Sequence, residues 1–148
     1  MGEGIPVTTA RDMMRSCLVV RNQAIVAEVV ERMQQWPVCM VVDEHDRVSG
    51  IVTEHDLARI VYESGQFDED VSVAGGLPAS LGMNVEQMRA VTVTEIMTAE
   101  PETIGPEMNL EEILKIIFRN HRNVLPVVES GRLLGVVYRM DAIKKVLG

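Results

Sequence analysis

Two stretches of this chain repeat one order of apolar and polar residues. In the first, an apolar run at 38–43 is followed by a polar turn and a second run at 48–56. In the second, runs at 124–129 and 133–141 follow the same order, with a turn one residue shorter. An internal repeat constrains the fold strongly, because each copy must form the same supersecondary unit. Both copies therefore predict a strand hairpin followed by a helix.

An amphipathic helix is expected before each hairpin. From Leu110 to Ile117, apolar residues follow the spacing i, i+3, i+4, i+7, which places them on one helix face. Asn109, with a glutamate three residues later, resembles a capping box, and this helix should end near 119–121. In the first copy we expect Asn22 to cap a helix that runs to about Gln34, where the following Trp-Pro pair stops it.

Each copy opens with a short capped turn and a short strand. The turn at 9–14 matches the segment at 94–98, and the strands are expected at 17–19 and 103–104. Each copy is then a β-α-β-β-α unit rich in β-branched residues. We predict an α/β fold in which two such units pack by their sheets with pseudo-two-fold symmetry.

The repeat also suggests domain boundaries. We place the first repeat at 7–62, the second at 91–148 and a linker at 63–90. A helix is expected over 84–90, with three side chains touching the core: Met83, Gln87 and Met88. The rest of the linker could be a loop or a flap over a cleft, because an ordered connection of this length without structure is uncommon.

Charge and composition exclude several classes of protein. The net charge is −8, and residues 1–74 hold 13 of the 22 Asp and Glu residues but only 6 Lys and Arg. An acidic surface argues against binding to nucleic acids or anionic membranes. The chain has no apolar run of about 18 residues and no signal-peptide pattern at its N-terminus, so we expect a cytoplasmic protein. The two cysteines, Cys17 and Cys39, are expected to be buried free thiols.

The two copies also carry a set of short motifs in order. The second copy carries them at 96–98, 101–104, 125–128 and 135–141, and the first has Gly-apolar-apolar-Thr-x-x-Asp at 50–56. Together these motifs resemble the CBS domain, named for cystathionine β-synthase. The resemblance implies a stand-alone tandem pair, or Bateman module, with clefts between its repeats. Such modules commonly form homodimers, and many bind AMP, ADP, ATP, S-adenosylmethionine or NAD, whereas others bind no known ligand.

Thr53 and Asp56 carry the chemistry expected of the signature. They lie at a strand end and in the first turn of the next helix, where open backbone amides favour a phosphate. The threonine hydroxyl can donate to a phosphate, and the aspartate carboxylate can accept from a ribose diol. The alternative is that Asp56 and its counterpart Asp141 only stabilise helix N-termini. Gly50 lies within the preceding strand, where a glycine is expected to mark a close approach of another backbone segment.

Two ligand sites are predicted, and we expect the first to be the functional one. It is built mainly on Thr53 and Asp56, with four residues forming an apolar adenine slot: Cys17, Leu18, Val38 and Met40. The second consists of five residues: Thr98, Thr103, Val124, Pro126 and Asp141. The copies differ because Tyr138 stands where the first has Thr53, and Met40 stands where the second has Pro126.

Two arginines could add phosphate contacts. Arg122 and Arg139 flank the strands of the second copy, and a guanidinium is a donor fork suited to phosphate. The alternative is that each is a solvated surface residue. The acidic turn around His45 is discounted as a metal site, because adjacent residues of an extended chain point in opposite directions.

No catalytic motif is found in the sequence: it has no nucleophile elbow, P-loop, zinc-protease helix or dinucleotide fingerprint. We therefore predict a non-catalytic regulatory module that binds an adenosine-containing ligand and transmits its occupancy through dimer shape to an unidentified partner protein. A ligand-free dimerisation or scaffold module is the alternative. A nucleotide-hydrolysing or nucleic-acid-binding protein is a third hypothesis.

Overall fold

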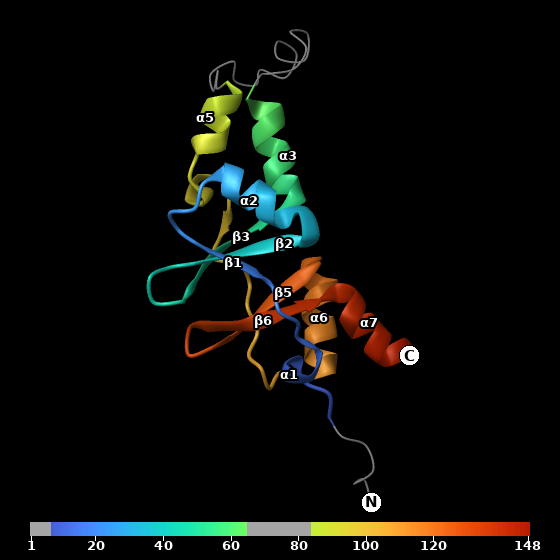
Figure 1. Ribbon diagram of the computed structural model, residues 1–148. Coiled ribbons are helices and arrows are strands. Elements are labelled where there is room, and N and C mark those ends of the chain that lie inside the picture. Colours follow the sequence, from blue (N-terminus) through green and yellow to red (C-terminus); the bar gives the residue numbers. More distant parts are fainter. Residues whose placement is uncertain (1–6, 65–83) are drawn as a thin grey trace, which may run out of the picture. The chain divides into compact units, whose positions relative to one another are not determined.

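Along the chain, each of the two predicted hairpins follows one helix and is followed by another (Figure 1). The computed structural model describes residues 7–64 and 84–148. Its backbone divides into two units. Unit 1 consists of Met1–Cys17, His45–Val48 and Pro101–Gly148, and unit 2 consists of Leu18–Glu44 and Ser49–Glu100.

Unit 2 is built around a sheet in the order β1-β2-β3-β4. The strands are β1 (Leu18–Arg21), β2 (Val38–Val42), β3 (Val48–Thr53) and β4 (Thr98–Ala99). β1 and β2 are parallel, with Leu18 opposite Cys39, whereas β3 and β4 are antiparallel, with Ile51 opposite Thr98. The helical elements are α2 (Val26–Arg32), η1 (Met33–Gln35), α3 (Glu54–Glu63), α5 (Val85–Ala90) and η2 (Val93–Glu95).

The core of unit 2 joins this sheet to its helices. The strands contribute alternate side chains, because successive residues of a strand point to opposite faces. The sheet residues of this core are Leu18, Val20, Cys39, Val41 and Val52, and the helices add Val26, Val29, Met33 and Ile60. All five residues of β2 are buried, so this strand is covered on both faces. Cys39 is buried and forms no disulfide with Cys17, as predicted.

Unit 1 contains an antiparallel hairpin of β5 (Val124–Glu129) and β6 (Arg132–Tyr138). Its turn uses positive φ angles at Ser130 and Gly131. Ile104 forms an isolated parallel bridge with Val127, which is the counterpart of the β1–β2 pairing in unit 2. The helices are α1 (Ala10–Met13), α6 (Leu110–Asn120) and α7 (Arg139–Leu147). Their apolar faces pack on the hairpin in a second core.

The opening segments of the two repeats are exchanged between the cores. α1 belongs by sequence to the first repeat, yet Ala10 N donates to Met108 O at 2.9 Å and its side chain lies in the core of unit 1. The equivalent segment of the second repeat joins unit 2, where Val93 N donates to Ala24 O at 2.7 Å. Each core is therefore assembled from both repeats.

The predicted ends of the second-copy helix are confirmed. Asn109 is the N-cap of α6, and its side-chain oxygen accepts a hydrogen bond from Glu112 N at 2.9 Å. His121 ends the helix in the left-handed conformation, with a φ of 55°. An N-cap of this kind satisfies a backbone donor that the helix leaves open.

The helix predicted over 84–90 is α5, although one of its expected core contacts is wrong. Met88 is buried, but Gln87 is exposed, and its side-chain oxygen accepts from Asn84 N at 2.9 Å. The side chain caps the helix because it follows the N-cap by three residues. Met83 lies outside the described residues.

The predicted start of the first-copy helix is also wrong. α2 begins at Val26, after Ile25 in an extended conformation, and Asn22 does not cap it. Ile25 pairs with Thr92 in an isolated bridge, and Val26 N donates to Val91 O at 2.8 Å. These bonds hold the chain extended up to the helix. The side-chain oxygen of Asn22 is buried without a hydrogen-bond partner in the part of the chain that the structure describes.

Candidate functional site

Thr53 and Asp56 form a reciprocal cap at the start of α3. The Thr53 hydroxyl accepts from Asp56 N at 3.3 Å, and Asp56 Oδ2 accepts from Thr53 N at 2.8 Å and from the Thr53 hydroxyl at 3.1 Å. Asp56 is only 4% exposed. These are the hydrogen bonds expected if Asp56 stabilises the helix N-terminus, which was the alternative to a ligand-binding role.

Arg59 balances the charge of this buried carboxylate. Its Nη2 lies 3.3 Å from Asp56 Oδ1 and 3.3 Å from the carbonyl oxygen of Ile96. The arginine therefore ties α3 to the exchanged opening segment of the second repeat. A buried carboxylate needs such a partner, because burial without one costs several kcal/mol, of order 3–5.

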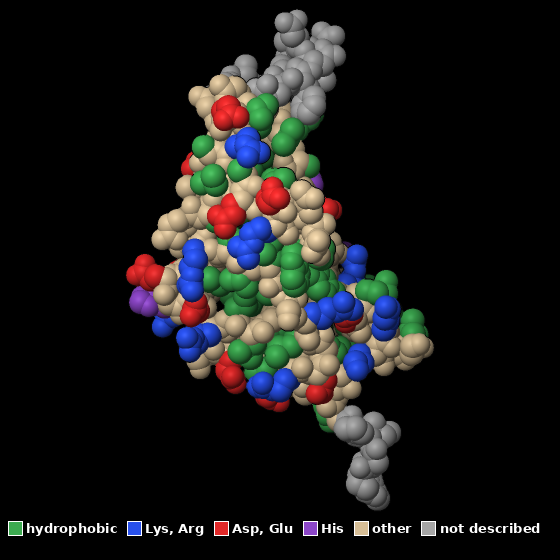
Figure 2. Space-filling view, viewed as in Figure 1, with side chains coloured by type: hydrophobic (Ala, Val, Ile, Leu, Met, Phe, Trp, Pro, Cys, Tyr) green, Lys and Arg blue, Asp and Glu red, His purple; other side chains and the backbone are tan. Residues whose placement is uncertain are grey.

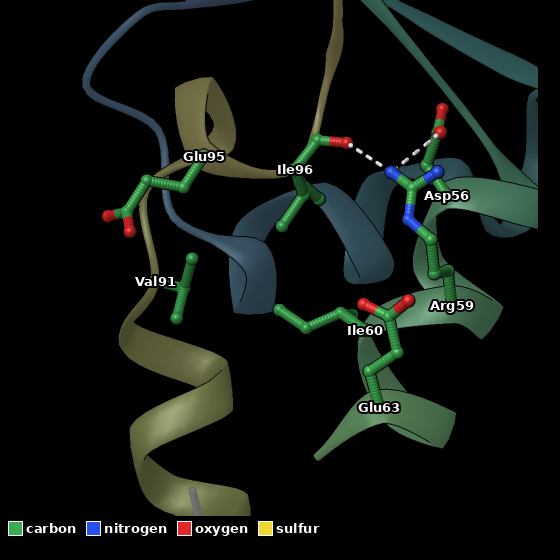
Figure 3. Close-up of a pocket in the computed structure, with 7 residues that line it drawn as sticks. All are labelled: Asp56, Arg59, Ile60, Glu63, Val91, Glu95 and Ile96. Atoms are coloured by element: carbon green, nitrogen blue, oxygen red, sulfur yellow. Dashed lines mark hydrogen bonds and ion pairs between the residues drawn. The ribbon is translucent and has the colours of Figure 1, made fainter. Parts of the chain in front are cut away.

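A cavity of about 420 Å³ lies beside this pair, between α3 and the segment that follows α5 (Figure 3). Its lining residues are Asp56, Arg59, Ile60, Glu63, Val91, Glu95 and Ile96. Four of them fall at i, i+3, i+4 and i+7 on α3, so they share one helix face. The sequence interpretation missed all of these except Asp56. That spacing was visible in the sequence, but nothing there indicated which segment would lie opposite it.

Asp141 has a different environment at the start of α7 in unit 1. Arg15 approaches it with two nitrogens, Nε at 2.8 Å from Oδ2 and Nη2 at 2.5 Å from Oδ1. The Asp141 side chain is 13% exposed, and the hydrogen bond to it raises the pKa of Arg15. Both carboxylate oxygens therefore accept from the same guanidinium. Tyr138 is the N-cap of α7 but makes no side-chain cap.

Arg15 is held in place along its whole length. Its N donates to Val136 O at 2.8 Å, and its O accepts from Val136 N at 3.0 Å. The guanidinium carbon lies 5.8 Å from the centroid of the Tyr138 ring, within the range of cation–π attraction. A Cβ at Gly135 would lie 2.6 Å from Arg15 O, so only glycine permits this approach.

The glycines fix the register between the two copies. A Cβ at Gly50 would meet the Met97 side chain and lie 2.9 Å from Thr98 O, just as Gly135 faces Met14 and Arg15. Arg15 is therefore the counterpart of Thr98. The comparison of the two repeats in the sequence, which matched 9–14 with 94–98, did not pair these two residues. The close approach inferred for Gly50 from its place in a strand is confirmed.

The structure regroups the residues predicted for the two ligand sites. Thr98 was assigned to the second site, but it pairs with Ile51 in unit 2, two residues before Thr53. Cys17 was assigned to the first site, but it belongs to unit 1, where it influences Tyr138. Thr103, Val124, Pro126 and Asp141 stay together in unit 1, and Leu18, Val38 and Met40 stay with Thr53 and Asp56 in unit 2.

Burial separates these residues further. Leu18, Val38, Met40 and Pro126 are buried, whereas Thr98 and Thr103 are exposed and Val124 is intermediate. The Cys17 thiol is half-buried, and burial raises its pKa to about 11, so it is a poor nucleophile near neutral pH. Burial also raises the pKa of the Tyr138 phenol.

The two arginines proposed to reach a phosphate differ. Arg122 Nε lies 3.0 Å from Glu102 Oε1, and this arginine and Asn120 lower the pKa of the Glu102 carboxylate. Arg122 is therefore engaged by a surface ion pair. Arg139 is exposed at the first position of α7.

A second, more apolar hollow lies on unit 1. It is a groove of about 590 Å³ lined by Leu110, Glu111, Leu114, Lys115, Phe118 and Val146. Phe118 is 81% exposed and Leu147 is 80% exposed. An aromatic side chain this exposed beside other apolar residues marks a surface where another molecule can bind.

The two units differ in charge. Unit 1 carries ten Lys and Arg against nine Asp and Glu, whereas unit 2 carries four against thirteen. On the face shown in Figure 2, acidic and basic side chains are interspersed among the described residues, without a continuous basic surface. Within residues 7–64 and 84–148, no helix is long and apolar enough to cross a membrane.

A family model described as "CBS domain" matches residues 4–63 and 93–148. The chain is 26% identical to the A-adding tRNA nucleotidyltransferase of Geobacter sulfurreducens, over 94% of this chain but 13% of that enzyme. It is 26% identical to the chloroplastic CBS domain-containing protein CBSX1 of Arabidopsis thaliana, over 85% of this chain and 55% of that protein. The chain thus spans about half of CBSX1 and a small part of the enzyme.

Solved structures show the same fold. The CBS domain of a Sphaerobacter thermophilus membrane protein superposes with a TM-score of 0.70 at 28% identity, covering 93% of this chain and 87% of that one. CBSX2 in complex with AMP gives 0.71 at 20% identity, covering 95% and 96%. The cytosolic domain of the Mg²⁺ channel MgtE in complex with ATP gives 0.68 at 24% identity, covering 93% and 48%.

Proposed function

This chain belongs to the CBS-domain family and carries two such domains in tandem, and from that premise we propose that it is a regulatory module that binds an adenosine-containing ligand. The intact Thr53–Asp56 pair carries the proposal. It fixes a carboxylate at the end of β3, where a ribose diol could donate to its remaining lone pairs. The AMP and ATP complexes of the similar CBS structures support this choice of ligand. The cleft between the repeats stays a prediction.

The first copy is the better candidate for the ligand. Asp56 meets Arg59 through one nitrogen at 3.3 Å, whereas Asp141 meets Arg15 through two nitrogens at 2.5 and 2.8 Å. A ligand that uses Asp141 must first displace this bidentate pair. The geometry therefore supports one working site on the first copy.

We also propose that the module is a homodimer that uses the groove on α6 and α7. Glu111 and Lys115 lie one turn apart on α6, on either side of Leu114 in the sequence. A two-fold axis near this point would bring each glutamate close to the lysine of a second copy, while Phe118 would be buried. Phe118→Glu is then expected to give monomers in light scattering, whereas the exposed Val85→Glu leaves the dimer intact. Monomeric wild-type protein would refute the dimer.

A ligand-free scaffold is the second candidate function. One observation favours it: both signature aspartates already have an arginine partner within their own unit. In either case the proposed module is not an enzyme, and it would act on a partner protein. The match to the tRNA nucleotidyltransferase is consistent with this, because it spans 13% of that enzyme.

Thermal unfolding with AMP, ADP, ATP, S-adenosylmethionine or NAD separates the two functions. A ligand at 100 times its dissociation constant adds about 2.7 kcal/mol if it binds only the folded state. For a chain of this size that is a rise of about 5–10 °C. We expect a rise with at least one adenosine ligand and its loss in Asp56→Asn. If none of the five raises the melting temperature, the ligand proposal fails and the scaffold is favoured.

A further inference from the structure

The guanidinium of Arg59 holds both the signature carboxylate and the opening segment of the second repeat. From this we propose that Arg59 is a two-position switch: a ligand diol moves it from Asp56 to Glu63, and the move releases the opening segment. The inference rests on the proposed adenosine ligand, and it adds how binding of that ligand is transmitted to the rest of the chain.

The Asp56 carboxylate is nearly saturated with hydrogen bonds. Its Oδ2 accepts from Thr53 N at 2.8 Å and from the Thr53 hydroxyl at 3.1 Å, and its Oδ1 accepts from Arg59 Nη2 at 3.3 Å. A carboxylate offers about four lone-pair sites, so one site is left. A ribose diol donates two hydrogen bonds, and its second hydroxyl must therefore take the site that Arg59 uses.

The bond from Arg59 is the easiest of these to displace. One nitrogen, Nη2, serves both Asp56 Oδ1 and Ile96 O, and each distance is 3.3 Å. Hydrogen bonds between charged groups are usually shorter, about 2.7–2.9 Å. The Arg59 side chain is also 44% exposed, so it has room to turn. Arg15 has no such freedom, because it grips Asp141 with two nitrogens at 2.5 and 2.8 Å.

Glu63 offers the displaced guanidinium a second partner. It follows Arg59 by four residues on α3, the spacing at which helix side chains meet. Both residues line the cavity of unit 2, as Figure 3 shows. Glu63 is half-buried, and within 7–64 and 84–148 no side chain forms an ion pair or a hydrogen bond with its carboxylate. Arg59 therefore has a carboxylate about one turn away in each direction along α3.

The opening segment loses a contact when Arg59 leaves Ile96 O. Next to Ile96, β4 pairs with β3 through two residue pairs, and Glu100 N donates to Ser49 O at 3.0 Å. Glu100 has a φ of 49° and is followed by Pro101, where the chain passes from unit 2 to unit 1. A diol at Asp56 thus loosens one of the covalent connections between the units.

Amide hydrogen exchange measured by NMR tests the switch on the wild-type protein, with AMP and 2′-deoxyadenosine 5′-monophosphate as matched ligands. The deoxy form has one ribose hydroxyl, so it can bind Asp56 without displacing Arg59. At saturation, AMP should speed exchange of the Met97 and Glu100 amides about tenfold, because a charged hydrogen bond to the segment is lost. The deoxy form should not speed either amide. As an internal control, neither ligand should speed the Val29 amide of α2.

The matched variants are Glu63→Gln and Glu86→Gln. Glu86 is exposed on α5 and does not line the cavity. Glu63→Gln removes the second position of Arg59 and should weaken AMP binding about twofold, the effect of one i, i+4 ion pair. It should leave the affinity for the deoxy nucleotide unchanged. Glu86→Gln should change neither affinity.

Three results would overturn the switch. Equal acceleration of the Met97 amide by both nucleotides, or no acceleration by bound AMP, would do so while leaving nucleotide binding in place. If calorimetry shows that neither nucleotide binds, the switch is also refuted, and the thermal screen with five ligands decides the proposed function separately.

Discussion

Asp56 and Asp141 occupy the same place in the two repeats, at the start of the helix that follows the hairpin, but they have different partners. Asp56 is held by a cap with Thr53 and by one nitrogen of Arg59, which lies one turn further along the same helix. Asp141 has no such cap and is held by two nitrogens of Arg15, which comes from the opening segment of the other repeat.

The two repeats share a backbone arrangement but differ in the side chains around the signature aspartate. Gly50 and Gly135 each permit a close backbone approach by an opening segment, so these two contacts are equivalent in the two units. The residue of the opening segment at this contact is Thr98 in unit 2 and Arg15 in unit 1. Arg15 therefore reaches Asp141 with two nitrogens, whereas Asp56, which is 4% exposed, is held by its cap and by one nitrogen of Arg59.

The largest effect is expected from adding a side chain at the two glycines that the opening segments approach. Gly135→Ala would place a Cβ 2.6 Å from Arg15 O, a backbone atom that cannot move without losing its bonds to Val136. We expect a loss of about 3 kcal/mol in urea unfolding, the upper end of the usual cost of overpacking. Gly50→Ala should cost less, about 2 kcal/mol, because part of its contact is with the flexible Met97 side chain.

Gly105→Ala is the matched control, since no atom lies within 4 Å of its added Cβ. Its unfolding free energy should stay within about 0.5 kcal/mol of the wild type. If Gly135→Ala is as stable as this control, the close backbone contact between Gly135 and Arg15, and its equivalence to the contact at Gly50, are wrong.

The ion pairs should differ in the next largest effect. Asp141→Ala removes two charged hydrogen bonds and should lower the unfolding free energy by about 2 kcal/mol. Arg59→Met removes the 3.3 Å contacts with Asp56 Oδ1 and Ile96 O and leaves a carboxylate that is 4% exposed without its guanidinium, so it should cost about 3 kcal/mol. A loss in urea unfolding smaller than that of Asp141→Ala would contradict the claim that Arg59 balances the buried Asp56 charge.

The caps give a smaller contrast. Thr53→Ala removes the side-chain acceptor at the start of α3 and should cost about 1 kcal/mol, while Thr53→Ser should restore most of it. Tyr138→Phe should leave the unfolding free energy nearly unchanged, because its hydroxyl caps nothing. A larger loss in Tyr138→Phe than in Thr53→Ala would reverse this part of the comparison.

The smallest effect concerns pH. The pKa of the Glu102 carboxylate is lowered in the folded state by Arg122 and Asn120, so the pair stabilises the fold above the pKa of the unfolded chain. This contribution is lost as the pH falls through the lowered value, below about 4.3. Between pH 7 and pH 3, the unfolding free energy of Glu102→Gln should therefore fall by about 0.5 kcal/mol less than that of the wild type. An equal fall in the two proteins would show that the Glu102–Arg122 pair does not stabilise the fold.

Local signals in the sequence predicted much of the fold. The cap at Asn109, the helix over 84–90 and the close approach at Gly50 each depend on a few neighbouring residues, and each is confirmed. The start of α2 was missed because Ile25 is held extended by Thr92, which is 67 residues away in sequence. The sequence near Asn22 contains no trace of that pairing.

The candidate site was only partly predictable for the same reason. Thr53 and Asp56 are paired as their spacing suggests, but the exchange of opening segments moves Thr98 and Cys17 to the other unit from the one expected. Arg15 carries no motif, and its importance arises from a backbone approach that depends on Gly135. The cavity joins a regular face of α3 to a segment whose position only the tertiary fold decides.

Calorimetric titration of the wild type, Asp56→Asn and Asp141→Asn with the adenosine ligand that gives the largest thermal shift tests the central claim most directly. One ligand is expected per chain, lost in Asp56→Asn and retained with similar affinity in Asp141→Asn. Two equal ligands per chain, or loss of binding only in Asp141→Asn, would contradict the assignment of the working site to the first copy.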